Sequence, residues 1–257
     1  MPSPFVWLLT LGFAVAGVAT AEPIRSARGD AYNADRQLLF RQMQYWFDDA
    51  DGEPRGLTLF VCPDGHAFAR RLSDYGAHPD TPDFSLEDAR TGYREGVRRE
   101  GARRIVYVRR AFNRPEQSAP LPGAQDAVID DGFNAYVAAH WESLLAGRDV
   151  PIQYLVPSRH RFYRFRIVKV DDANPRELRL RMQFDFWFGR FLPHVFVTFD
   201  TTTRRLIRYE GISNIRDADG ANVSVHMESP LSERRDDVPR TQLDDALTAP
   251  LDGRCTL

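Results

Sequence analysis

The chain has 257 residues and a formal net charge of −2 at pH 7. This length fits one large β-rich domain or two small ones. The near balance of acidic and basic residues argues against nucleic acid as a partner, because a nucleic-acid surface requires a basic stripe or patch.

The first residues predict export. Phe5 to Ala19 form an uncharged apolar run, and Ala19-Thr20-Ala21 follows with the small-x-small pattern of a signal-peptidase site. The run is too short to span a bilayer, which requires roughly 20 apolar residues. We therefore expect a signal peptide at residues 1–21, a periplasmic mature protein and no membrane span in it; an uncleaved anchor is the alternative.

The tetrapeptide Asp-Ala-Asp-Gly occurs twice, at residues 49–52 and 217–220. A calcium loop of the EF-hand type needs oxygen ligands at its first and twelfth positions. If Gly52 is the sixth position, the first is Phe47 and the twelfth is Thr58, and the second loop fails at both ends as well. Asp-Gly between apolar runs instead predicts β-hairpin turns.

Short apolar segments separated by turn residues predict an antiparallel sheet. The clearest are QLLFRQMQYWF, LTLFVC, RRIVYVRR, FYRFRIVKV, ELRLRMQFDFWF, HVFVTFD and RLIRYEGI. TPDFSLEDARTG is interpreted as a loop with one helical turn. The fold class is therefore mainly β (α+β), with about 10 strands in a single domain over residues 22–231. From residue 232 to 257 the chain is polar, and we expect a loosely ordered tail.

One amphipathic helix is predicted at about residues 126–147. Its apolar residues recur at helical spacing and share one face; they are Ile129, Phe133, Tyr136, Val137, His140, Trp141 and Leu144. Asp126 or Asp130 is a candidate cap at its start, and Gly147 ends it. We expect a curved sheet or half-barrel wrapped around this helix; a sandwich with the helix at its side is the alternative.

Several segments resemble uncharacterised exported proteins of Gram-negative bacteria. They are PDFSLEDARTGYREGVR, RRLIRYEGISNIRDADG and the VPS at residues 156–158. This resemblance carries no established chemistry, so it implies no catalytic residues. The layout also resembles the lipoprotein-carrier fold of the bacterial periplasm, an open barrel around helices, and that likeness is one of fold only.

Motifs for catalysis are absent from the sequence: there is no G-x-S-x-G, H-E-x-x-H, P-loop or dinucleotide fingerprint. The six histidines lack metal-ligand spacing, so we expect neither a metal nor another cofactor. An enzyme is not favoured. Cys62 and Cys255 allow a disulfide in an exported protein, and two free thiols are the open alternative.

The strand at Glu177–Phe188 has an alternating apolar face, which is either a core face or the wall of a cavity for an acyl chain. With the helix stripe it gives the candidate ligand-lining residues Phe133, Val137, His140, Trp141, Leu144, Met182, Phe184, Phe186 and Phe188. His140 is either a satisfied core histidine or the polar group of that cavity. The arginine-rich runs at 103–110 and 159–166 either bind anionic head groups or are solvated strand faces.

The sequence favours an exported, non-enzymatic protein that binds or shields an apolar ligand, such as a lipid, in a curved sheet. Two alternatives remain: an envelope interaction protein with a closed core, and a hydrolase with a dispersed site. The ligand, the protein partner and the oligomeric state are not encoded in any recognisable pattern.

Overall fold

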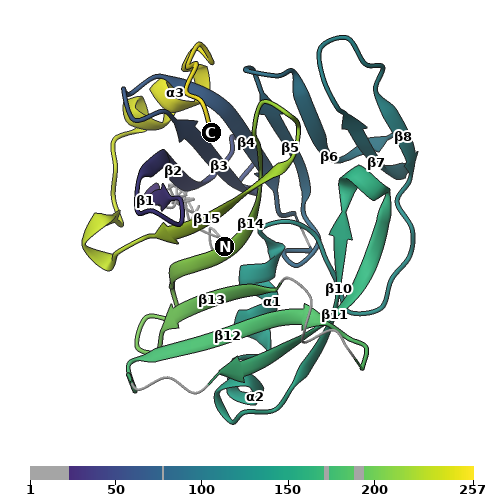
Figure 1. The fold of residues 1–257 in the computed structure, drawn as a ribbon, viewed down its shortest axis with the longest axis vertical. Helices are drawn as coiled ribbons and strands as arrows, with labels where there is room; N and C mark the ends of the chain where they lie inside the picture. Colours follow the sequence, from purple (N-terminus) through teal and green to yellow (C-terminus); the bar gives the residue numbers. More distant parts are fainter. Residues whose placement is uncertain (1–22, 77, 171–173, 188–193) are drawn as a thin grey trace, which may run out of the picture.

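The computed structural model describes residues 23–76, 78–170, 174–187 and 194–257. These residues form one large open sheet of 16 strands, with three α-helices packed against it (Figure 1). In chain order the elements are β1 (Arg25–Tyr32), β2 (Leu38–Asp48), β3 (Pro54–Val61), β4 (Ala67–Asp74), β5 (Asp83–Asp88), β6 (Tyr93–Glu100), β7 (Arg103–Arg109), β8 (Gln117–Pro120), β9 (Ala127–Val128), α1 (Gly132–Ala139), α2 (Trp141–Leu145), β10 (Val150–Val156), η1 (Pro157–Arg159), β11 (Arg161–Val170), β12 (Glu177–Phe184), β13 (Val195–Asp200), β14 (Leu206–Arg216), β15 (Asn222–Glu228), η3 (Leu231–Glu233), β16 (Arg234–Arg235) and α3 (Arg240–Thr248).

The sheet consists of two β-meanders joined edge to edge. Strands β1 to β8 pair antiparallel in sequence order, and so do β10 to β15. The two meanders meet where β1 pairs with β15, from Asp30 opposite Glu228 to Tyr32 opposite His226. Two short strands complete the sheet: β9 runs parallel to β10 at one edge, and β16 pairs with β1 beside β15. The first and last long strands are therefore neighbours at the centre of the sheet.

The predicted mainly β class is confirmed, but the predicted number of about 10 strands is wrong. The segment interpreted as a loop at 81–92 contains β5, which pairs with both β4 and β6. Its inward residues Phe84, Leu86 and Asp88 alternate and are buried. The strand was missed because only two of those three inward positions are apolar.

Both Asp-Ala-Asp-Gly segments are hairpin turns, as predicted. The Oδ1 atom of Asp49 accepts hydrogen bonds from the backbone N–H groups of Asp51 (2.9 Å) and Glu53 (3.0 Å). Asp217 makes the equivalent pair of bonds at 3.0 and 2.9 Å, and both turn glycines have φ near +80°. Each aspartate thus closes its own turn, as side chains of this type do.

The predicted helix at 126–147 is divided into β9, α1 and α2. Asp126 and Asp130 have φ values of +50° and +47° and do not cap a helix; the residue before α1 is Asp131, whose side chain makes no capping bond. The segment at 127–128 pairs with β10 instead of joining the helix. Gly147, with φ +75°, follows α2 and ends it as predicted.

The sheet is not wrapped around one helix. Both α1 and α2 pack against β10–β13 in one apolar cluster. A second cluster lies under β2–β7, β14 and β15 and is filled mainly by the strands' own side chains, among them Phe40, Phe60 and Phe68. No helix within the described ranges combines the length and apolar character needed to cross a membrane.

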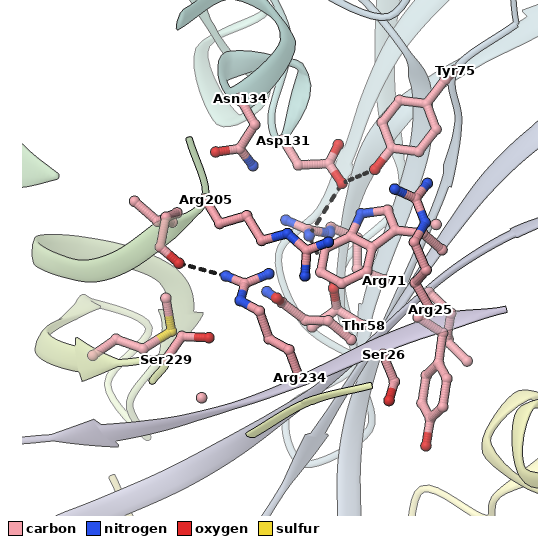
Figure 2. A pocket seen from close by; sticks show the side chains of 18 of the residues that line it. Arg25, Ser26, Thr58, Arg71, Tyr75, Asp131, Asn134, Arg205, Ser229 and Arg234 are labelled. Carbon is pink, nitrogen blue, oxygen red and sulfur yellow. Dashed lines mark hydrogen bonds and ion pairs between the residues drawn. The ribbon is translucent and has the colours of Figure 1, made fainter. Parts of the chain in front are cut away.

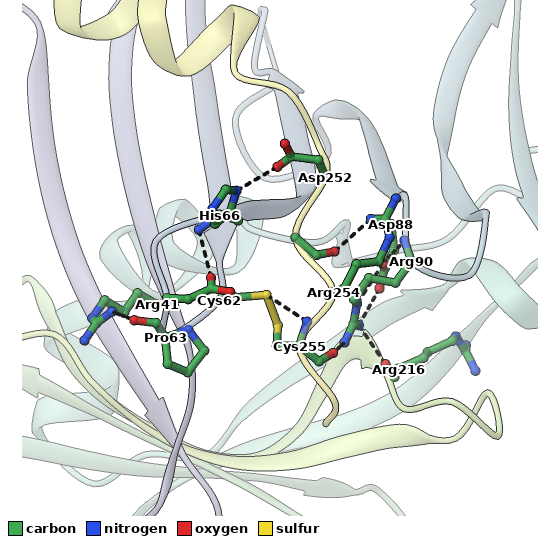
Figure 3. Close-up of a disulfide and its surroundings, with 12 residues drawn as sticks. Arg41, Cys62, Pro63, His66, Asp88, Arg90, Arg216, Asp252, Arg254 and Cys255 are labelled. Carbon is green, nitrogen blue, oxygen red and sulfur yellow. Dashed lines mark hydrogen bonds and ion pairs between the residues drawn. A yellow bond between two sulfur atoms is a disulfide. The ribbon is translucent and has the colours of Figure 1, made fainter.

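The segment after residue 232 is structured, in contrast to the predicted loose tail. Helix α3 buries Leu243 and Ala246 against the outer face of β2 and β3. Beyond it, the backbone N–H of Gly253 donates to the carbonyl oxygen of Ala67 at 2.8 Å. A disulfide joins Cys255 to Cys62 (Figure 3). A few apolar residues on one helix face and this covalent bond hold a polar segment in place.

Candidate functional site

The predicted helix stripe and strand face do meet. Val137, Trp141 and Leu144 are buried in one cluster with Leu178, Leu180 and Phe199, and Phe133 is half-buried beside them. The Trp141 and Phe199 rings lie edge to face with centroids 6.0 Å apart. These side chains pack directly on one another, so this part of the predicted cavity wall is core.

The strand residues of the prediction lie further along β12. Met182 and Phe184 are half-buried, and Phe184 stacks on Phe165 with ring centroids 4.5 Å apart. Phe186 is 43% exposed, and Phe188 lies outside the described residues. The strand face therefore changes from core at Leu178 to surface at Phe186.

His140 lies between α1 and α2, and its ring is hydrogen-bonded to the end of α1. Its Nδ1 lies 2.9 Å from the carbonyl oxygen of Tyr136 and donates to it, because a carbonyl oxygen can only accept. Its ring lies 4.2 Å from the Tyr136 ring, centroid to centroid. Both contacts are explained by local packing.

The arginine-rich runs are also used structurally. Arg104 pairs with Asp83 at 2.6 Å, and Arg109 donates to the carbonyl oxygen of Gly92 at 2.9 Å. Arg166 pairs with Asp185 and Asp149 on an exposed face. These runs do not converge on a common anion site.

A different pocket, of about 230 Å³, lies where the two meanders and α1 approach one another. We call it the arginine pocket. Its walls come from β1–β4, the start of α1, the β13–β14 turn, β15 and β16. Its lining residues are Arg25, Ser26, Gly29, Gln44, Tyr45, Trp46, Gly56, Leu57, Thr58, Arg71, Tyr75, Asp131, Asn134, Phe199, Arg204, Arg205, Leu206, Met227, Ser229 and Arg234.

The pocket is strongly cationic, because five arginines and one carboxylate line it. Figure 2 shows the guanidinium groups of Arg71, Arg205 and Arg234 turned toward one another. Arg205 pairs with Asp236 at 3.0 Å, and Arg204 pairs with Glu142 at 2.9 Å. Both of those carboxylates are largely exposed, so water weakens the two ion pairs.

Arg234 combines partial burial with the lack of a carboxylate partner among the described residues. It is half-buried, and its Nη2 donates to the carbonyl oxygen of Leu206 at 2.5 Å. No ion pair joins it to a carboxylate of the described residues. Burial lowers the pKa of Arg234, and the neighbouring Arg205 guanidinium lowers it further, although Asp236 acts in the opposite direction. A guanidinium held among apolar groups and another cation gains from an incoming anion.

The inner end of the pocket is a polar cluster around Arg71. Its guanidinium lies 2.9 Å from Asp130 and 3.3 Å from Asp131, and it donates to Thr58 Oγ1 at 2.9 Å. Asp131 also accepts from the Tyr75 hydroxyl at 2.7 Å. Burial lowers the pKa of Arg71, but the two carboxylates outweigh it and hold the pKa above its ordinary value.

Gly132 explains why this cluster lies so close to the loop after β4. A Cβ atom at Gly132 would lie 2.2 Å from the carbonyl oxygen of Asp80. Only glycine permits that approach at the first residue of α1. The adjacent Ile129 N–H donates to the same carbonyl oxygen at 3.0 Å, which fixes the Asp130–Asp131 segment beneath the first meander.

The arginine pocket was not predicted from the sequence, because its five arginines come from three strands and one turn and form no local motif. Three basic pairs contain lining residues, Arg70-Arg71, Arg204-Arg205 and Arg234-Arg235, but similar pairs occur elsewhere in the chain. Among the described residues no group of three or more His, Cys, Asp or Glu side chains is arranged to hold a metal ion.

Comparison with known proteins gives one structural likeness. No family model matches the chain, and no curated protein matches it. A solved structure described as a beta-barrel-like protein of a domain of unknown function, DUF1849, from Brucella abortus has a TM-score of 0.46 and 11% sequence identity. The alignment covers 82% of this chain and 96% of that chain. At this level the likeness transfers no residue role, activity or ligand.

Proposed function

We propose that this chain is an exported, non-enzymatic binding protein of the periplasm that holds a small anionic amphiphile in the arginine pocket. The observation that carries the proposal is the excess of five arginines over one carboxylate in a concave site. Ligand sites are concave, with apolar walls and a few placed polar groups that fix orientation.

The cations account for the anionic end of the ligand. Arg205 and Arg234 face the pocket, and Arg234 has no carboxylate partner in the described part of the chain. Charge-assisted hydrogen bonds from arginine to a carboxylate, sulfate or phosphate are roughly twice as strong as neutral ones. An anion bound between the two guanidinium groups would relieve their mutual repulsion.

The other walls of the pocket would contact the apolar part of the ligand. Trp46, Leu57, Phe199, Leu206 and Met227 contribute apolar surface beside the arginines. Phe199 also belongs to the cluster that contains Trp141, so the apolar face predicted from sequence borders the pocket from behind. We therefore assign the apolar ligand predicted from sequence to a different pocket and expect it to have a charged end.

A second candidate is an envelope interaction protein with a closed core. Its support is that Val137, Trp141 and Leu144 fill the space between helix and sheet completely enough to be buried. This candidate requires no small ligand, and the binding experiment below separates the two.

Calorimetric titration with octyl sulfate, below its micelle concentration, tests the proposal. The double variant Arg205→Gln/Arg234→Gln is expected to lose at least about tenfold in affinity, because each lost charged contact costs about 1.5 kcal/mol or more. Arg235→Gln is the matched control, since Arg235 is exposed and bonds only backbone carbonyls. Equal affinity in the double variant and the wild type would remove the arginine pocket as the site.

Export is tested separately. Expression of the full chain with its first 21 residues should yield a periplasmic protein whose intact mass begins at Glu22. A protein that retains Met1 in the membrane fraction contradicts the export part of the proposal without affecting the binding part.

A further inference from the structure

Arg71 belongs to two charge clusters at once. Its guanidinium lines the arginine pocket, and the same guanidinium contacts the carboxylates of Asp130 and Asp131 at 2.9 and 3.3 Å. Asp131 also faces the pocket, whereas Asp130 does not. One cation therefore compensates two carboxylates, and any anion that enters the pocket competes with Asp130 for it.

Apart from Arg71, the Asp130 carboxylate is compensated by a hydrogen bond from the backbone N–H of Asp131. The groups that act on its charge from neighbouring elements are Tyr75 after β4, Glu95 on β6, Tyr154 on β10 and Tyr209 on β14. Each of these four groups is neutral or negative. Tyr154 donates a long bond, 3.3 Å, to the backbone carbonyl of Asp130, not to its carboxylate.

Arg216, the cation that acts on Glu95, is already engaged. Arg216 donates to the Tyr93 hydroxyl at 3.1 Å, and that hydroxyl donates to Glu95 at 2.5 Å. Burial raises the pKa of Asp130 to about 6; Arg71 opposes the rise and Asp131 adds to it. Asp130 thus lies near its titration point in the pH range of a bacterial envelope.

We propose that binding of an anion in the arginine pocket is coupled to uptake of a proton by Asp130, through the Arg71 guanidinium that both share. The inference rests on the proposed function. An anion beside Arg71 withdraws part of the compensation from Asp130 and adds a negative charge nearby. Both effects favour the protonated carboxyl.

The sign of the coupling follows from linkage. A site that binds an anion more tightly when Asp130 is protonated also protonates Asp130 more readily when the anion is bound. Affinity therefore increases as the pH falls from 8 toward 5.5 and levels off once Asp130 is protonated in the free protein. Because coupling between linked sites is typically 5- to 150-fold, we expect at least about fivefold tighter binding at the lower pH.

Glu95 is a second buried carboxyl that acts on Asp130, and burial raises its pKa to about 7. His226 precedes the lining residue Met227 and lies 3.2 Å from Glu228. The partners of Arg204 and Arg205 are the exposed carboxylates of Glu142 and Asp236. Glu95→Gln and His226→Gln are therefore the matched controls for the other ionisable groups near Asp130 and near the pocket.

Inorganic sulfate is the probe, because its charge does not change between pH 5.5 and 8. Titration calorimetry at constant ionic strength gives the affinity at each pH, and repetition in two buffers of different ionisation heat gives the protons taken up. Asp130→Asn should bind sulfate equally at both pH values, without proton uptake. Asparagine suits this position because Asp130 has φ +47°, where Asn is tolerated.

The outcomes are distinct. Wild type, Glu95→Gln and His226→Gln should all show the pH dependence, and only Asp130→Asn should lose it. Wild-type binding that is independent of pH, or a dependence that persists in Asp130→Asn, overturns the coupling and leaves the proposed function standing. Absence of sulfate and octyl sulfate binding by the wild type at both pH values contradicts the proposed function and the coupling together.

Discussion

Replacement of Trp141 by alanine tests whether the helix stripe supports the sheet. Trp141 is 2% exposed, packs edge to face on Phe199 and lies under the Arg204 guanidinium at 5.3 Å. Truncation of a buried tryptophan removes its transfer free energy and leaves a cavity, at a cost of about 3–5 kcal/mol. For a domain of this size that loss lowers the Tm by roughly 10 °C.

Ala138 provides the control, because it lies on the exposed side of the same helix. Ala138→Ser should change the free energy of unfolding by no more than about 0.5 kcal/mol. Urea titrations followed by circular dichroism measure both variants. Equal losses at the two positions would refute the packing of the helix stripe against β12 and β13.

Three further predictions concern charge, the disulfide and calcium. Burial raises the pKa of Glu95 to about 7, so Glu95 favours folding at acidic pH, and this contribution is lost as the pH rises from about 4.5 through 7. Glu95→Gln should therefore be more stable than wild type at pH 8, by on the order of 3 kcal/mol. Urea titrations measure the difference, and the exposed Glu100→Gln, as the control, should change little. The double variant Cys62→Ala/Cys255→Ala should lose about 2–5 kcal/mol of stability and expose the C-terminal segment to limited proteolysis; unchanged stability and protection would contradict the anchoring role of the bond. Millimolar calcium should leave the Tm unchanged, because the aspartates of both Asp-Ala-Asp-Gly turns bond their own backbone; a saturable rise would show a metal site.

Local patterns in the sequence predict the local structure well. The two Asp-Gly turns, the alternating strands and the end of α2 at Gly147 each depend on a few adjacent residues, and each is present in the structure. The contact between the helix stripe and β12 also follows from periodicity, because two apolar faces without other partners pack together.

Strand pairing and tertiary contacts explain where the observed structure differs from the structure predicted from sequence. Segment 127–128 has helical neighbours in sequence, but β10 offers it backbone partners, so it becomes a strand. The C-terminal segment is too polar to predict as ordered, yet Leu243, Ala246 and Cys255 suffice to attach it. Neither the strand at 127–128 nor the ordered C-terminal segment can be predicted from a few adjacent residues.

The candidate site was the least predictable feature. The arginine pocket draws its cations from positions as distant as Arg25, Arg71 and Arg234, and the β1–β15 and β1–β16 pairings bring them together. Arginine is abundant throughout this chain, so composition does not separate these residues from surface arginines. Only the fold shows which of them lack carboxylate partners.

The most direct test of the central claim is extraction of co-purifying small molecules from protein isolated under native conditions, followed by mass spectrometry. We expect the wild type to carry an anionic amphiphile, and the double variant Arg205→Gln/Arg234→Gln, purified in parallel at equal amount and still folded, to carry much less of it. Wild-type protein that carries no such molecule, or a variant that carries as much of it, would contradict a binding role for the arginine pocket.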